Sequence, residues 1–192
     1  MTPIEMEQIL DSMSILIDTR EQDTERARRR YSSFGIPCEK CVLDFGDYTW
    51  QFSVNGTVFH DTSTRVIPKV AIERKMSLDE MAQCFTRDRK RFKAEMIRAR
   101  EAGGRMFLIC ENSSWEALIA GKYRSQFAPN AFIASIVAWS VRYDLQVIFC
   151  KEETTGRLIK EILFRDLKER LSNEDKEVYK WMDKTVSGDM GE

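Results

Sequence analysis

Short apolar runs separated by polar clusters set the pattern of this chain. Their length of a few residues predicts buried strands, and they occupy residues 14–17, 70–72, 105–110 and 145–150. Residues 38–43 and 46–52 have an extended, alternating pattern that predicts two further strands. Asn55-Gly56 is typical of a tight turn between antiparallel strands, so a hairpin is expected there.

Between the strands the apolar positions change to helical spacing. Residues 77–102 are predicted to form one long helix, with Ser77 as N-cap, Glu80 as its capping-box partner and a stop at Gly103-Gly104. Further helices are predicted over residues 22–34, 115–120, 129–143 and 152–170. Strands that alternate with helices after residue 70, with a hairpin at one end, predict an α/β fold whose mixed sheet is flanked by helices.

The length of 192 residues suits one domain with an ordinary core. No apolar run approaches the roughly 20 residues of a membrane span, and the N-terminus carries Glu5 and Glu7 rather than a basic leader, which predicts a cytosolic protein. The five cysteines mostly have apolar neighbours, so we expect reduced core thiols. Cys38-x-x-Cys41 has the spacing of a zinc pair, but no second pair accompanies it.

The most informative polar residues are Asp47, Glu73 and Lys75. In a strand, Glu73 and Lys75 project to one face and Arg74 to the other. With Asp47 from a neighbouring strand, Glu73 can hold Mg²⁺ through oxygens and leave positions for water and a phosphate. Lys75 can then orient or help to deprotonate the attacking water and offset negative charge in the transition state. The set predicts metal-assisted phosphodiester hydrolysis, and a solvated strand edge is the alternative.

These residues resemble a known family. Residues 72–79 (Ile-Glu-Arg-Lys-Met-Ser-Leu-Asp) fit the Glu-Arg-Lys-x-x-x-Asp signature of XPF-type structure-specific endonucleases, and residues 46–48 fit their Gly-Asp-Tyr step. Residues 16–21 look like the family's first strand with its Asp-x-Arg-Glu end. Arg91-Phe92-Lys93 is similar to its Arg-aromatic segment, and residues 134–149 resemble its later helix and strand. The segments follow one another in the family's order. A small stand-alone protein of this kind resembles the bacterial or phage members of the family.

The resemblance implies a restriction-endonuclease-like core that uses Mg²⁺ or Mn²⁺ to cut branched or flap- or fork-like DNA in repair, recombination or replication. It implies a nuclease domain over residues 1–170 in the cytoplasm of a bacterial or phage-infected cell, with an acidic tail over residues 171–192. Asp47 and Glu73 would be metal ligands with Asp18 beside them as a third. The implied catalytic residues are Asp18, Arg20, Asp47, Glu73, Arg74, Lys75 and Asp79. For Asp79, in the first turn of a predicted helix, capping is the alternative role.

Three features depart from the family pattern. Glu95 stands where the family usually has Gln, and the segment 51–69 is longer than in compact members. Nothing after residue 171 has the length or the glycines of the tandem helix-hairpin-helix domain that many members carry.

Charge is unevenly distributed along the chain. The formal net charge is only -1, but residues 87–105 contain eight basic and three acidic side chains. Such an excess of one sign favours contact with a phosphate backbone over a merely solvated helix face. The candidate DNA-binding residues are Arg87, Arg89, Lys90, Arg91, Lys93 and Arg124, and the arginines of residues 26–30 form a second candidate patch.

DNA is therefore the expected partner and no membrane is expected; a homodimer or a partner protein stays open. Three other interpretations remain beside the structure-specific nuclease. The chain could be a DNA-binding module without catalysis, a nuclease of the same core with another specificity, or a subunit that recruits a partner protein through its acidic tail.

Overall fold

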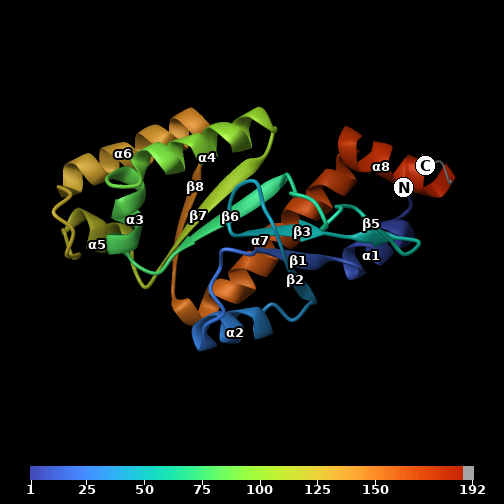
Figure 1. Cartoon of the computed structure of the whole chain (residues 1–192), viewed down its shortest axis with the longest axis horizontal. Helices are drawn as coiled ribbons and strands as arrows, with labels where there is room; N and C mark the ends of the chain where they lie inside the picture. The colour runs from blue at the N-terminus through green and yellow to red at the C-terminus, as the bar shows by residue number, and fades with distance from the viewer. Residues whose placement is uncertain (188–192) are drawn as a thin grey trace.

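A computed structural model describes residues 1–187 and builds the chain around a mixed six-stranded sheet (Figure 1). The strand order is β2-β1-β3-β6-β7-β8. Strand β3 is antiparallel to both β1 and β6, whereas β1–β2, β6–β7 and β7–β8 pair in parallel. The bounds are β1 Ser14–Asp18, β2 Cys38–Cys41, β3 Tyr48–Gln51, β6 Val70–Lys75, β7 Arg105–Glu111 and β8 Gln146–Cys150.

Helices cover both faces of this sheet, which confirms the predicted fold class. One apolar core joins the sheet to α3 Leu78–Phe85, α4 Arg89–Glu101, α5 Trp115–Ile119 and α6 Pro129–Tyr143. The other joins it to α1 Pro3–Asp11, α2 Glu25–Ser32, α7 Glu152–Ser172 and α8 Lys176–Ser187. Because strand side chains alternate, Ala71 packs in the first core and Val70 and Ile72 pack in the second.

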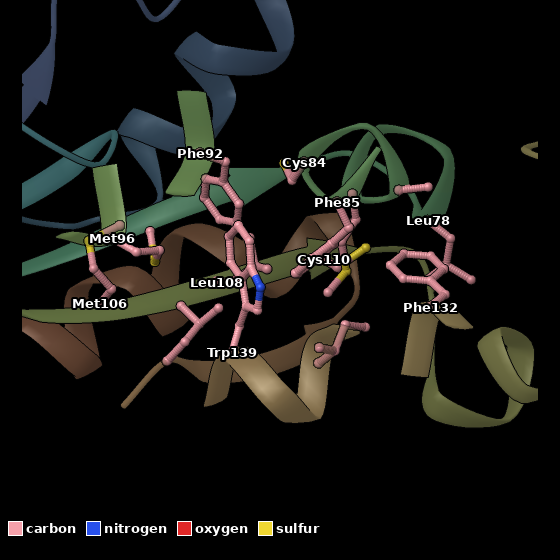
Figure 2. Packing of buried hydrophobic residues seen from close by; sticks show 14 of the residues in the cluster. Leu78, Cys84, Phe85, Phe92, Met96, Met106, Leu108, Cys110, Phe132 and Trp139 are labelled. Carbon is pink, nitrogen blue, oxygen red and sulfur yellow. The ribbon is translucent and has the colours of Figure 1, made fainter. Parts of the chain in front are cut away.

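The predicted single helix over residues 77–102 is wrong, because the chain breaks between α3 and α4. At the break, Thr86 leaves helical geometry (φ −120°, ψ −98°), and its hydroxyl donates to the carbonyl of Ala82 at 2.8 Å. Such local bonds compete with a continuing helix. In one straight helix Phe85 and Phe92 would be about 10 Å apart along the axis, but here their ring centroids are 5.9 Å apart and both rings contact Trp139 (Figure 2). Tertiary packing on one indole therefore decides the break.

The hairpin at Asn55-Gly56 is confirmed, as a separate two-stranded sheet of β4 Ser53–Val54 and β5 Thr57–Val58. Both turn residues have positive φ, 51° and 81°, as the type I′ turn requires. The longer segment noted in the sequence thus adds a hairpin beside the main sheet rather than a strand of it.

The structure adds two helices that the apolar pattern did not reveal. Helix α1 begins with a capping box between Thr2 and Glu5 and buries Ile9. Helix α8 lies within the segment predicted as an acidic tail, yet Val178 is fully buried and Trp181 packs edge-on against Phe59. The domain boundary at residue 170 stays a prediction, and the end of that tail, 188–192, lies outside the described residues.

The five cysteines are free thiols, of which Cys41, Cys84 and Cys110 are buried. None of the helices within residues 1–187 has the length and the apolar character needed to cross a membrane.

Candidate active site

Three neighbouring strands bring the predicted acidic residues to one face of the sheet. The backbone N–H of Asp18 donates to the carbonyl of Asp47, and that of Asp47 donates to the carbonyl of Ile72, both at 2.8 Å. Tyr48 pairs with Ile17 of β1 and with Ile72 of β6, and these three side chains pack in the α7-side core. Asp18, Asp47 and Glu73 alternate with them and therefore face the side covered by α3 and α4.

Glu73 and Lys75 form the centre of this arrangement. The Lys75 ammonium group donates to Oε1 of Glu73 at 2.5 Å, and both residues are buried, with exposed fractions of 4% and 9%. Burial is the largest single effect and disfavours the charge on Lys75, but Glu73, Cys84 and Asp47 together outweigh it and raise the pKa of Lys75 above its ordinary value. Lys75 is therefore a cation at neutral pH and acts as a donor.

Asp47 lies next to this pair, immediately before β3, and is half-buried. Its Oδ2 accepts a hydrogen bond from the backbone N–H of Arg74 at 2.8 Å, which ties it to β6. Burial, and then the negative charge of Glu73, raise the pKa of Asp47 well above its ordinary range, while Lys75 works in the opposite direction. Two carboxylates that are shielded from water and repel each other are suited to share a cation.

Gly46 allows this approach of Asp47 to β6. Its φ is +74°, and a Cβ placed on it would lie 2.6 Å from the Cβ of Ala71. Only glycine fits a left-handed backbone at so close a contact.

Asp18 is on the same face but is already engaged. Its two oxygens accept from the Arg20 side chain at 2.6 and 3.0 Å, and from the backbone N–H groups of Arg20 and Leu43 at 2.7 and 2.9 Å. Asp18 is fully buried, whereas 59% of the Arg20 side chain is exposed. The ligand role of Asp18 and the catalytic role of Arg20 stay predictions, and these bonds favour a supporting role for Asp18.

Glu95 of α4 faces the same site, and its role there was not predicted. It is 4% exposed, and its Oε1 accepts from the backbone N–H of Gly46 at 2.8 Å. Burial and the charge of Glu73 raise its pKa. The sequence did contain a signal, because Glu95 lies on the buried stripe of its helix, three residues after Phe92 and four before Ala99.

Arg74 lies on the opposite face, as the strand spacing predicts. Its guanidinium contacts Glu111 of β7 at 3.2 Å and Glu21 at 3.7 Å. Glu111 is fully buried and also binds Arg26 at 2.7 Å, and Glu21 accepts from the Tyr48 hydroxyl at 2.6 Å. The catalytic role of Arg74 stays a prediction. Arg74 contacts the site through its backbone N–H, which donates a hydrogen bond to Asp47.

Asp79 is hydrogen-bonded to Arg124. Oδ1 of Asp79 accepts from the backbone N–H groups of Arg124 and Ser125, both at 2.7 Å, and Oδ2 accepts from the Arg124 side chain at 3.3 Å. Asp79 thus ties the first turn of α3 to the loop after α5. Within residues 1–187, no hydrogen bond or ion pair joins Asp79 to Asp47 or Glu73.

Apart from Arg124, the predicted DNA-binding residues lie on and just before α4. Arg87 and Arg91 pair with Asp88, and Arg89 stacks over the Trp139 ring at 5.4 Å. Lys90 and Lys93 are exposed, and in the described part of the chain no acidic side chain pairs with either.

The second candidate patch, on α2, is neutralised within the protein. Arg28 pairs with Asp23 and Arg29 with Glu25. Arg26 and Arg30 both contact Glu111.

The donor set fits Mg²⁺ rather than zinc. In the part of the chain that the structure describes, no group of three or more His, Cys, Asp or Glu side chains is arranged to hold a metal ion. Asp47, immediately before β3, and Glu73, on the adjacent strand β6, offer hard carboxylate oxygens. Mg²⁺ is commonly held by one or two carboxylates, with water and substrate phosphate completing its coordination, so these two residues suffice for such a site.

Comparisons with known proteins bear on the family and the fold of the chain. The profile of the ERCC4 domain matches residues 17–162. The fold is similar to that of XPF from Aeropyrum pernix (TM-score 0.52, 19% identity), covering 78% of this chain and 59% of that one. A structure of XPF from Aeropyrum pernix in complex with DNA gives a TM-score of 0.52 at 20% identity, covering 84% and 65%. The chain thus spans about three fifths of the length of these proteins. Comparison with curated protein sequences finds no match.

Proposed function

Since the chain belongs to the ERCC4 domain family of XPF-type nucleases, we propose that it is a metal-dependent endonuclease that hydrolyses phosphodiester bonds of branched or flap- or fork-like DNA. One observation carries this proposal: Asp47, immediately before β3, is hydrogen-bonded to β6 beside Glu73, and Lys75 is hydrogen-bonded to Glu73. The order of the signature residues supports the same reaction.

Each residue then has a defined task. Asp47 and Glu73 would hold Mg²⁺ or Mn²⁺, which supplies a Lewis acid and lowers the pKa of bound water. The backbone N–H of Arg74 orients Asp47. Lys75 is cationic, so it orients water by donating a hydrogen bond and offsets negative charge that develops on the phosphate.

The exposed basic side chains of α4 would contact the DNA backbone. Lys90 and Lys93 are the strongest candidates because no acidic side chain within residues 1–187 pairs with either. That a similarly folded protein is known in complex with DNA supports this assignment. The preference for branched substrates, and a role in repair, recombination or replication, rest on the family resemblance alone.

Two features weigh against a purely binding role. Asp47, Glu73 and Lys75 are all present, and Glu73 and Lys75 are held buried and ordered at the site. A module that only bound DNA or recruited a partner would have no use for two carboxylates that repel each other next to a buried lysine. Association into a homodimer or with a partner protein stays a prediction.

Cleavage assays test the proposal. End-labelled flap, fork, junction and linear duplexes are incubated with the protein in Mg²⁺, Mn²⁺ or EDTA, beside Asp47→Asn, Lys75→Ala and the control Asp11→Asn, whose side chain is exposed on α1. We expect metal-dependent cutting of branched substrates by wild type and the control, and binding without cutting by the two site variants. Wild type that binds DNA but cuts no substrate with either metal would overturn the proposal.

A further inference from the structure

Glu95 is a buried carboxylate on an otherwise apolar helix face. It lies on the stripe of α4 that carries Phe92, Met96 and Ala99, all of them at most 2% exposed. A charged group is placed on such a face at a considerable energetic cost unless a partner compensates it. A carboxylate at this position therefore needs a reason other than keeping an exposed helix face polar.

Within residues 1–187, no lysine or arginine lies at ion-pair distance from Glu95. Its one hydrogen bond there is the backbone N–H of Gly46, which occupies Oε1. The negative charge of Glu73 raises the pKa of Glu95, and the positive charges of Arg20 and Arg91 act in the opposite direction. The second oxygen, Oε2, is left for another partner.

The geometry points to a divalent cation as that partner. Resting on the function proposed above, we propose that Glu95 is a further acidic residue of the metal site, which binds the ion held by Asp47 and Glu73 through a water molecule. Glu95 reaches the site from α4, whereas Asp47 immediately precedes β3 and Glu73 lies on β6. Because no group of three or more such side chains within residues 1–187 is arranged to hold a metal ion directly, Glu95 acts through one of the water molecules that Mg²⁺ readily keeps.

The alternative is that Glu95 only tethers α4 to the Gly46 turn. Glu95→Gln separates the two roles, because the Gln carbonyl still accepts from Gly46 N–H while the charge is lost. Glu101→Gln is the matched control, since it makes the same change on the same helix at an exposed position. Glu95→Met, which fills a similar volume without charge, is measured alongside in case the Gln variant does not fold.

Mn²⁺ binding to the metal-free protein is measured by calorimetry, together with Tm with and without the ion. We expect Glu95→Gln to weaken Mn²⁺ binding about 10- to 100-fold, with Tm of the metal-free protein unchanged or raised and Glu101→Gln like wild type. Wild-type Mn²⁺ affinity in the folded Glu95 variants, or a lowered metal-free Tm with unchanged affinity, overturns the proposal. Wild type that neither binds Mn²⁺ nor cuts DNA overturns the proposed function itself. Wild type that does both, beside a Glu95→Gln variant with unchanged affinity, overturns only the role of Glu95.

Discussion

The ammonium group of Lys75 lies 2.5 Å from Oε1 of Glu73, two residues earlier on the same strand. Both side chains are buried, so neither is well solvated and each depends on the other for compensation of its charge. The pair also explains why a lysine in this position stays protonated, because the carboxylate raises its pKa against the effect of burial.

Lys75→Met should therefore affect both cleavage and stability. It leaves Glu73 buried without a counter-charge, which is expected to lower the free energy of unfolding by about 3 kcal/mol. The double variant Glu73→Gln/Lys75→Met removes both charges and should recover most of that stability while remaining inactive. Urea unfolding and cleavage assays measure the two effects. A double variant no more stable than Lys75→Met would show that the two charges are not coupled.

Gly46 offers a second test, because its backbone allows Asp47 to approach β6. Gly46→Ala combines a left-handed φ with a contact of 2.6 Å to Ala71. Gly35 has a similar φ of +68° but nothing within 4 Å of its added Cβ, so Gly35→Ala is the matched control. We expect about 3 kcal/mol of destabilisation for Gly46→Ala against about 1 kcal/mol for the control, and a loss of cleavage only for the former. Equal losses of stability in the two variants would mean that the structure adjusts to the contact between the added Cβ and Ala71 without cost.

Local patterns predicted the strands and the way Glu73 and Lys75 face together, because the two-residue period of a strand is a property of the backbone. The separation of Arg74 from them follows from the same period. The break between α3 and α4 was missed, since it depends on Trp139, about 50 residues away in sequence, holding Phe85 and Phe92 at once.

The roles of Glu95 and Glu111 were missed for a related reason. Each is defined by a partner from a distant segment: Gly46 for Glu95, and Arg26 and Arg74 for Glu111. Charge counting placed the basic segment on α4, but it could not show that the arginines of α2 are paired with acids. Such pairing depends on side-chain positions that no sequence spacing fixes.

The basic surface of α4 makes a prediction about salt. Lys90→Ala/Lys93→Ala removes two exposed, unneutralised charges and should weaken DNA binding. If each lysine contacts one phosphate, the slope of log affinity against log salt should fall by about 0.9 per lysine. Arg28→Ala/Arg29→Ala on α2 is the control, because both arginines are paired with acids. Titrations of fluorescent DNA at several salt concentrations measure the slopes, and equal slopes for the two double variants would remove α4 from the binding surface.

His60, the only histidine, makes stability depend on pH. Burial, and then the charge of Lys69, lower its pKa to about 4, and its Nε2 is buried without a hydrogen-bond partner. In the unfolded chain His60 becomes protonated near pH 6.5, whereas in the folded protein it becomes protonated only near pH 4. His60 therefore reduces stability as the pH falls through that window, by about 3 kcal/mol at its lower end.

His60→Phe should remove this loss, since Phe fits the aromatic contacts that His60 makes with Trp50 and Phe59 and needs no hydrogen bond. Burial and the charge of Glu73 raise the pKa values of Asp47 and Glu95. These two carboxylates have the opposite effect and stabilise the fold as the pH falls. The difference between wild type and His60→Phe in urea unfolding, from about pH 7 to about pH 4, isolates the histidine because the carboxylates are common to both. Parallel stability curves for the two proteins would show that His60 is protonated as easily in the folded state as in the unfolded chain.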